Sequence, residues 1–294
     1  MSRTDFYSPS AIRHIGAKHG FRNSKSLGQN FLTDRGVTEE IVDASDIGPE
    51  DLVIEIGPGF GTLTAAAAKR AGRVAAVEID RQLIPILETT LGTYDNIEII
   101  NRDILKTDIS DVIDETKKDF PWIRDVKVIG NLPYYITTPI IMKLLEGGAP
   151  CSLITVMMQK EVADRICSPP GKKTYGALSI AVQYYCEVTR VCDVPKEMFT
   201  PVPKVDSAVL RLDVRTEKPV ELLNEELFFV CVKAGFSRRR KTLLNCLTGL
   251  RGMEKDEVRE VLENAGIDPV RRAETLTIDE FARIANDVER GSVR

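Results

Sequence analysis

The chain has 294 residues, a length that suits a catalytic domain with a smaller second domain. Hydrophobic residues make up 43% and charged residues 29%, which is typical of a globular protein and excludes disordered and fibrous classes. No apolar run reaches the roughly 18 residues of a membrane helix, and the N-terminus lacks the apolar core of a signal peptide. We therefore expect a cytoplasmic protein without a membrane partner.

Cysteine and histidine are placed in a way that disfavours several kinds of site. The six cysteines form no C-x-x-C pair, so we expect reduced thiols and no structural zinc. The only histidines of the sequence, His14 and His19, lie near the N-terminus. We therefore expect chemistry that needs neither a metal ion nor an imidazole.

The net charge of −4 hides an uneven distribution. Residues 1–35 contain six Lys or Arg against two Asp, and the body of the chain is acidic. A second basic cluster has five cations and no acid: Lys233, Arg238, Arg239, Arg240 and Lys241. Basic segments on an acidic body indicate a localised phosphate-binding surface, although solvated charge on helix faces would give the same pattern.

Short apolar runs alternate with helical patterns along the first two thirds of the chain. Strands are predicted at 52–56, 73–79, 96–100, 126–129, 153–158 and 208–214. Helices are predicted at 62–71, 82–91 and 139–146. This alternation predicts a parallel sheet with helices on both faces, and ligands of such sheets lie beyond the carboxyl ends of the strands.

The composition changes after residue 214. Residues 217–219 (EKP) are typical of a linker, and Gly266 stands where a helix would end. Four further helices are predicted, at 225–234, 239–247, 254–265 and 278–287. We expect two domains, residues 1–214 and a small helical domain of residues 215–294.

A glycine-rich turn follows the first predicted strand, with Glu55, Gly57, Gly59 and Gly61 at alternate positions. Glycines allow positive φ and a close approach of the backbone to a ligand. The spacing G-x-G-x-G differs from the G-x-G-x-x-G of dinucleotide sites. It suits S-adenosylmethionine, which has no pyrophosphate, but the loop alone leaves a dinucleotide enzyme as an alternative.

Three acids lie at or just after the ends of later strands. Glu78 ends the second strand, where a carboxylate can accept hydrogen bonds from both ribose hydroxyls of either kind of cofactor. Asp103 follows the third strand and could accept a hydrogen bond from the cofactor's adenine, or be an ordinary loop acid. Asp80 is interpreted as the N-cap of the next helix.

The tetrapeptide Asn131-Leu132-Pro133-Tyr134 follows the fourth strand. The nitrogen of an adenine amine is a poor nucleophile, because its lone pair is delocalised into the ring. The Asn131 side-chain oxygen, with a backbone carbonyl held out by Pro133, can accept hydrogen bonds from both N–H groups and aim the lone pair at a sulfonium methyl. Tyr134 offers a face on which an extruded base can stack. An isolated N-x-P-Y is more often a turn, but its position after the glycine loop and Glu78 favours methyl transfer by positioning and electrostatics.

With these motifs in order, the sequence resembles the small-subunit ribosomal RNA adenine dimethyltransferases over nearly its whole length. The shared motifs are 26–32 (SLGQNFL, beginning with Ser26), 55–61 (EIGPGFG), 77–80 (VEID), 131–134 (NLPY), 159–162 (QKEV), 199–201 (FTP), 203–208 (PKVDSA), Phe236 and 239–243 (RRKTL). Cys246 departs from the family pattern, which has a second polar residue beside Asn245.

The resemblance implies an α/β, Rossmann-like class I S-adenosylmethionine methyltransferase domain with a small all-helical C-terminal domain. It implies methylation at N6 of two adjacent adenosines in a hairpin loop near the 3′ end of small-subunit rRNA, within a pre-ribosomal particle, by a monomer. The implied cofactor contacts are Asn30, Leu32, Gly57, Glu78, Asp103 and Asn131. The implied adenine-handling residues are Asn131, Leu132, Tyr134 and Phe199.

We expect part of the basic cluster to bind rRNA phosphates at the junction of the two domains, or else to dock the domains. Three other functions stay open. They are a large-subunit rRNA adenine methyltransferase with the same N-x-P-Y core, a non-catalytic RNA-binding factor on this fold, and a nicotinamide oxidoreductase.

Overall fold

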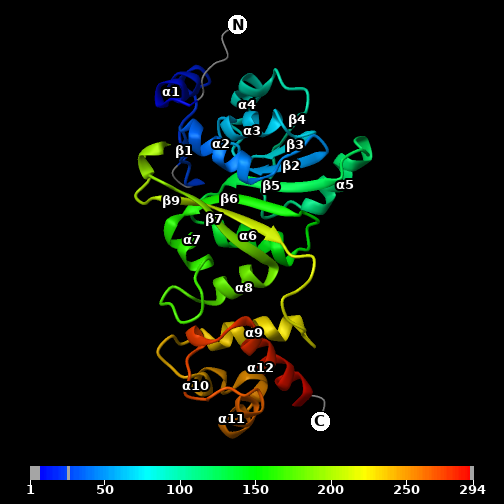
Figure 1. The fold of residues 1–294 in the computed structure, drawn as a ribbon. Coiled ribbons are helices and arrows are strands. Elements are labelled where there is room, and N and C mark those ends of the chain that lie inside the picture. Colours follow the sequence, from blue (N-terminus) through cyan, green and yellow to red (C-terminus); the bar gives the residue numbers. More distant parts are fainter. Residues whose placement is uncertain (1–6, 25–26, 292–294) are drawn as a thin grey trace. The chain divides into compact units, whose positions relative to one another are not determined.

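Seven strands form one sheet in the computed structural model, which describes residues 7–24 and 27–291. Across the sheet the strands are β4 (Ile97–Ile100), β3 (Arg73–Val77), β2 (Asp51–Ile56), β5 (Asp125–Asn131), β6 (Leu153–Gln159), β9 (Ser207–Val214) and β7 (Cys186–Val194). The first five run parallel, which confirms the predicted parallel sheet for these strands (Figure 1). β9 runs antiparallel to β6. The chain runs from β7 to the neighbouring β9 through residues 195–206. This connection lacks the α-helix that a crossover between parallel strands needs.

Helices cover both faces of the sheet. Consecutive strand residues point to opposite faces, and the neighbours Val53 and Ile54 of β2 are each fully buried. Ile41 and Leu63, from two helices, pack with Val53 in one core cluster, and Figure 1 shows α6 on the other side. The helices of this region are α2 (Arg35–Ala44), α3 (Thr62–Ala68), α4 (Ile84–Leu91), α5 (Ile109–Asp119) and α6 (Thr137–Glu146).

A short N-terminal segment lies beside the carboxyl edge of the sheet. After α1 (Pro9–Lys18), residues 27–32, here called the strap, end in β1 (Phe31–Leu32), which pairs antiparallel with β8 (Phe199–Thr200). The side chain of Gln29 donates to the Asp80 carboxylate at 2.7 Å. These contacts tie the strap to segments distant in sequence. Ser26, and the basic residues Arg3 and Lys25, lie outside the described residues.

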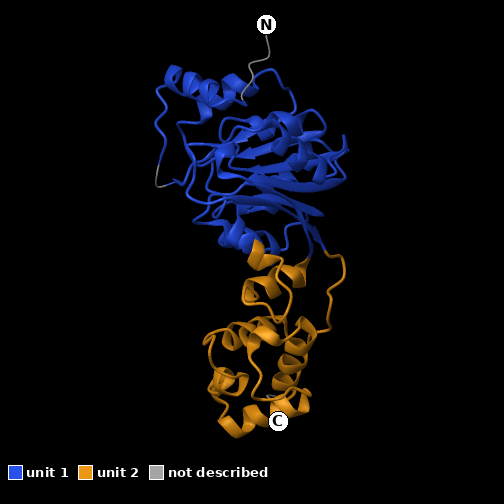
Figure 2. Ribbon diagram, turned by 60° about the vertical axis from the view of Figure 1, so that its left-hand side comes forward, with its two compact units in different colours: residues 1–163, 187–214 blue, residues 164–186, 215–294 orange. Residues whose placement is uncertain are grey.

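The chain divides into two units, shown in Figure 2. Unit 1 comprises residues 1–163 and 187–214, and unit 2 comprises residues 164–186 and 215–294. Unit 2 is therefore made of two separate stretches of chain. Its helices are α8 (Ala177–Tyr185), α9 (Glu225–Gly235), α10 (Leu243–Leu247), α11 (Lys255–Asn264) and α12 (Ile278–Gly291), while α7 (Lys160–Ile166) contains the change of unit.

The two stretches of unit 2 are joined by buried aromatic side chains. The hydroxyls of Tyr184 and Tyr185 on α8 each donate to the Glu225 carboxylate at 2.8 Å. The ammonium of Lys218 lies over both rings, 4.9 and 4.1 Å from their centroids. The tyrosine ring of residue 184 also packs against Phe228. These contacts explain why α8 groups with the C-terminal helices.

The predicted helices of the C-terminal part are confirmed, with one correction. Residues 239–242 were expected inside a helix, but α10 begins at Leu243 and the segment before it consists of turns and bends. The N–H of Lys241 donates to the carbonyl of Arg238 at 2.9 Å, which closes one of these turns. A helix through this segment would place the like charges of Arg238 and Lys241, three positions apart, side by side on one face. Gly266 follows α11 with φ +70°, as predicted for a helix end.

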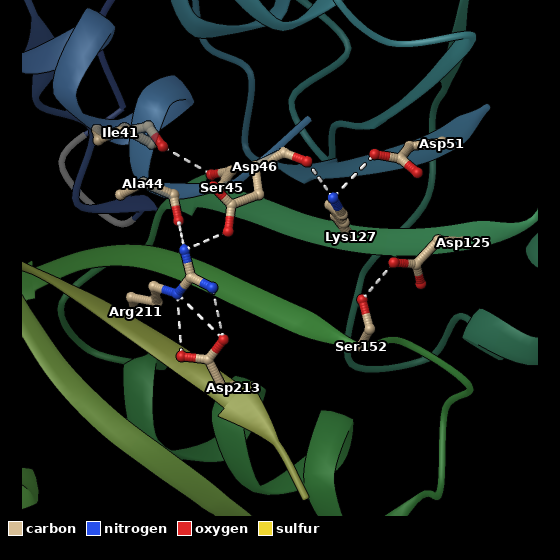
Figure 3. Close-up of polar contacts among 10 residues, drawn as sticks. All are labelled: Ile41, Ala44, Ser45, Asp46, Asp51, Asp125, Lys127, Ser152, Arg211 and Asp213. Atoms are coloured by element: carbon tan, nitrogen blue, oxygen red, sulfur yellow. Dashed lines mark hydrogen bonds and ion pairs between the residues drawn. The ribbon is translucent and has the colours of Figure 1, made fainter. Parts of the chain in front are cut away.

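A polar network lies at the amino edge of the sheet (Figure 3). Lys127 of β5 forms an ion pair with Asp51, the first residue of β2, at 2.9 Å, and both side chains are 10% exposed. Lys127 also donates to the carbonyl of Asp46. Arg211 of β9 binds the carboxylates of Asp46 and Asp213. This network ties three strands together at the edge opposite the strand carboxyl ends. Within the described ranges, no helix is both long and apolar enough to cross a membrane.

Candidate active site

The carboxyl ends of β2, β3 and β5 border a cavity of about 260 Å³. In this sheet the chain order reverses between β2 and β5, which is where open α/β sheets bind their ligands. Segments after β4 and the strap complete the cavity wall. Eight of the residues singled out from the sequence line it: Asn30, Leu32, Gly57, Glu78, Asp103, Asn131, Leu132 and Tyr134. The structure thus brings together side chains from five separate stretches of sequence.

The glycine-rich turn follows β2 with left-handed backbone. Gly57 and Gly59 have φ of +70° and +59°. A Cβ atom at residue 59 would lie 2.9 Å from Cδ1 of Phe31 in the strap. Glycine is therefore required here both by the backbone conformation and by the strap that packs on the turn.

Glu78 is 5% exposed at the end of β3. One carboxylate oxygen accepts a hydrogen bond from the N–H of Asp80 at 2.7 Å. Burial raises the pKa of Glu78 from its ordinary value to about 7. Asp80 was expected to be the N-cap of α4, but Leu83 occupies that position. Its carboxylate accepts instead from the N–H of Gln82 at 2.9 Å, which closes the turn before the helix.

Glu55 is a cavity residue that the sequence singles out only as part of the glycine motif. It is 1% exposed, and no described residue forms a hydrogen bond with its Oε2. Burial, together with repulsion from Glu78, raises the pKa of Glu55 to about 8. Two buried acids in one cavity, one with an unsatisfied oxygen, suit a ligand that carries positive charge.

Asn131, the last residue of β5, is held by the strap. Its side-chain Nδ2 donates to the backbone carbonyl of Asn30 at 2.9 Å, which leaves Oδ1 as the acceptor of this amide. The Asn30 side chain in turn donates to the carbonyl of Gly28 at 3.0 Å. The carbonyl of Pro133 accepts from the N–H of Ile136 and from the Thr137 hydroxyl, at 3.1 and 3.0 Å. Both hydrogen bonds hold the Pro133 carbonyl within the turn before α6.

Of the three remaining site residues predicted in unit 1, Tyr134 and Asp103 line the cavity and Phe199 lies outside its lining. The hydroxyl of Tyr134 is 2.7 Å from Oγ of Ser207, and burial raises the pKa of this tyrosine. Asp103 accepts from the N–H of Leu105 at 3.0 Å. Phe199 is 1% exposed and pairs with Leu32 across β1 and β8, and it is not among the described residues that line the cavity.

All five cations of the basic cluster are exposed in unit 2. Arg239 contacts Glu274 at 4.0 Å and donates to the carbonyl of Lys173, so its guanidinium already binds groups of unit 2.

A second, polar cavity is lined by Ser237, Arg238, Lys241, Asn245, Cys246, Thr248 and Lys255. Lys255 was missed from the sequence because it lies on α11, away from the cluster. Cys246 contacts the carbonyls of Arg238 and Lys241 through its sulfur, so the departure from the family pattern braces this turn.

Comparison with known families decides among the alternatives. The family model described as "Ribosomal RNA adenine dimethylase" matches residues 20–289 of the chain. The chain belongs to the ribosomal RNA adenine dimethylase family. It is therefore an S-adenosylmethionine-dependent adenine methyltransferase, and the oxidoreductase and non-catalytic alternatives fall away.

Relatives match this dimethylase over nearly its whole length. The "Ribosomal RNA small subunit methyltransferase A" of Alkaliphilus metalliredigens is 52% identical, over 96% of this chain and 97% of its own length. The protein of the same name from Clostridioides difficile is 51% identical over 95% of each chain.

Two solved structures share the fold of the dimethylase. A dimethyladenosine transferase from Plasmodium falciparum has a TM-score of 0.75 and 27% identity, over 89% of this chain and 98% of that one. The 23S rRNA methyltransferase ErmE has a TM-score of 0.66 and 28% identity, over 88% of this chain and 100% of that one. The predicted Rossmann-like class I methyltransferase fold with a helical C-terminal part is confirmed.

The cavity of this dimethylase fits S-adenosylmethionine. That cofactor carries an ammonium and a sulfonium, and the buried, unsatisfied oxygen of Glu55 and the carboxylate of Glu78 are suited to a cation with hydroxyl groups. The glycine turn leaves room for close approach of such a ligand to the end of β2.

Proposed function

We propose that this enzyme transfers methyl groups from S-adenosylmethionine to N6 of two adjacent adenosines in a hairpin loop near the 3′ end of small-subunit rRNA. The observation that carries the chemistry is the hydrogen bond from Asn131 Nδ2 to the Asn30 carbonyl, since it presents Oδ1 as an acceptor at the cavity. The choice of RNA rests on the relatives at 50% identity or more, which are named for the small subunit. The 23S rRNA methyltransferase is only 28% identical.

In this mechanism Asn131 Oδ1 and the Leu132 carbonyl accept the two N–H groups of the target amine. The paired acceptors draw the nitrogen out of conjugation with the ring and direct its lone pair. The cofactor supplies an activated methyl group on its sulfonium, so no strong base is required. Tyr134, anchored by Ser207, provides the face on which the extruded base stacks. The methylated nitrogen is then positively charged and acidic, and it releases one proton to solvent. One N–H remains, and one acceptor is enough to hold it.

The other cavity residues hold the cofactor in this proposal. Glu78 accepts from the ribose hydroxyls, and Asp103 from the adenine amine. Gly57, Asn30 and Leu32 contact the cofactor from the glycine turn and the strap. Phe199 handles the target base indirectly, because it is buried beside Leu32, its partner in the pairing of β1 with β8.

We further propose that the methyltransferase domain lies within residues 1–214, apart from residues 164–186 of unit 2, and that residues 215–294 bind rRNA through the basic cluster. The enzyme would act as a monomer on a pre-ribosomal particle in the cytoplasm. The support is the set of exposed cations Lys233, Arg238, Arg240 and Lys241, together with Lys255 at the polar cavity. Exposed cations on an otherwise acidic chain favour binding to phosphates.

The test is transfer of labelled methyl groups to small-subunit particles or rRNA lacking the modification, with large-subunit RNA offered in parallel, followed by mapping of the labelled nucleotides. Label on two adjacent adenosines near the 3′ end supports the proposal. Label confined to large-subunit RNA would make this a large-subunit methyltransferase. Calorimetric binding of S-adenosylmethionine without transfer to any RNA would contradict the assigned reaction.

A further inference from the structure

Two consecutive tyrosines stand at the cavity in different environments. Tyr134 is half-buried and bonded through its hydroxyl to Ser207, whereas Tyr135 is 55% exposed. Both line the cavity, and they occupy the turn between β5 and α6. Because the Tyr135 ring both lines the cavity and stays open to solvent, a ligand that enters the cavity from solvent can contact it.

The ring of Tyr135 is supported from the strap. A Cβ atom at residue 28 of the strap would lie 3.3 and 3.6 Å from Cδ1 and Cε1 of this ring. Gly28 has φ +60°, so the strap presents bare backbone to one edge of the ring. The ring is held in place from the strap side while much of its surface stays open to solvent.

We propose that Tyr135 stacks against the base that neighbours the target adenosine in the RNA strand. When the target base leaves its stack and enters the cavity, its neighbour is left without a stacking partner and stays at the rim. An aromatic ring at that rim restores a stacked contact without reading the base's edges. The proposal rests on the proposed function, under which the neighbour is the second adenosine to be methylated. Tyr135 then holds one adenosine of the pair while the other reacts.

The test compares Tyr135→Phe, Tyr135→Leu and Tyr135→Ala in equilibrium binding to small-subunit rRNA lacking the modification, with S-adenosylhomocysteine present so that no transfer occurs. We expect Tyr135→Phe to bind as the wild type does. The Leu and Ala variants should bind about 5- to 150-fold more weakly, the range expected when one base no longer stacks. The salt dependence of binding should not change, because every phosphate contact remains. Affinity for S-adenosylmethionine and the thermal midpoint should also match the wild type, which separates this role from a structural one.

A direct signal comes from Tyr135→Trp combined with Trp122→Phe, which removes the chain's single native tryptophan. Stacking should quench the new indole's fluorescence when RNA binds. Wild-type affinity in Tyr135→Leu, or equally weakened binding in Tyr135→Phe and Tyr135→Leu, would overturn the proposal. The binding measurement does not depend on which nucleotide is methylated. Label mapped outside the adjacent adenosines would therefore contradict the proposed function, while the stacking role is judged by binding.

Discussion

The side-chain amide of Asn131 donates to the backbone carbonyl of Asn30, a residue 101 positions earlier in the chain. One hydrogen bond therefore couples the last residue of β5 to the strap, and it fixes which atom of the amide faces the cavity as acceptor. The strap is held independently by the pairing of β1 with β8 and by the bond from Gln29 to Asp80. Asn30 is thus a positioning residue for Asn131 through its main chain, as well as a cavity residue.

Replacing Asn131 should separate chemistry from cofactor binding. We expect Asn131→Ala to lower the rate of methyl transfer by about 10²–10³, because the variant cannot make the hydrogen bond to the reacting amine. Asn131→Asp keeps the acceptor but places a carboxylate against the Asn30 carbonyl, so it should also be impaired. Single-turnover transfer and calorimetric affinity for S-adenosylmethionine, measured in parallel, check this. Near wild-type turnover in Asn131→Ala would contradict the role of this side chain.

Glu78→Gln should weaken cofactor binding, whereas Asn131→Ala slows methyl transfer. The carboxylate is replaced by an amide of the same shape, and the ribose hydroxyls lose a charged acceptor. Hydrogen bonds to charged groups contribute roughly 1.5–3 kcal/mol each, so we expect cofactor affinity to fall about tenfold or more. Calorimetry on the purified variant measures this directly. Unchanged affinity would show that Glu78 does not contact the ribose.

Cofactor affinity should rise with pH between about 6 and 8. The pKa values of Glu78 and Glu55 are raised to about 7 and about 8, and a cationic ligand favours their ionised forms. Binding at pH 6 should release protons, detectable by calorimetry in buffers of different ionisation enthalpy. Without cofactor the sign reverses. The folded chain keeps protons that the unfolded chain loses above about pH 4.5, so its stability should fall as pH rises toward 8.

Glu55→Gln is the control for this pH dependence. It should flatten the fall in stability and reduce the proton release. A pH profile identical to that of the wild type would rule out Glu55 as the titrating group.

The buried pair of Lys127 and Asp51 should matter for stability and not for activity. Removing one partner, as in Lys127→Met, leaves a buried charge unpaired, and we expect a loss of about 3–5 kcal/mol in the free energy of unfolding. The exposed pair of Arg124 and Glu50 is the matched control, and Arg124→Gln should cost about 1 kcal/mol or less. Denaturant unfolding compares the two variants. Equal losses would mean that burial of the pair is unimportant.

The exposed cations of the basic cluster, together with Lys255, should divide into two functional groups. We expect replacement of Arg238, Lys241 and Lys255 by Gln to weaken RNA binding. Each phosphate that no longer meets a cation should reduce the log–log salt slope by about 0.7–0.9. Arg239→Gln should leave that slope unchanged, because Arg239 is bound to Glu274 and the Lys173 carbonyl. Binding to small-subunit rRNA at several salt concentrations measures both. A lowered thermal midpoint with an unchanged slope in the triple variant would instead favour a docking role.

Much of the sheet and the site could be predicted from the sequence because both depend on local pattern. Apolar runs identified β2 to β6 and β9, and polar residues directly after parallel strands had to meet at one edge. Glu78 and Asn131 were found in this way, and both line the cavity. The carboxylate of Glu78 and the amide of Asn131 then indicated which chemistry the site performs.

The features that the sequence did not predict depend on contacts between segments that are distant in the chain. The antiparallel direction of β9 follows from its return beside β7, which no pattern in residues 207–214 encodes. The burial of Phe199 could not be predicted either, because it depends on pairing with a strap more than 160 residues away. Lys255 joins the polar cavity only because α11 packs beside α10.

The two-part construction of unit 2 has a consequence for how the protein is made. A chain synthesised from its N-terminus contains every residue of the sheet once residue 214 has been added. At that moment the residues of α8 have been synthesised, but Glu225, which accepts hydrogen bonds from its two tyrosines, has not. The nascent chain must therefore keep an apolar helix without its partners until the last quarter is translated. A chain stopped at residue 214 should accordingly aggregate or bind chaperones, even though its catalytic residues are all present.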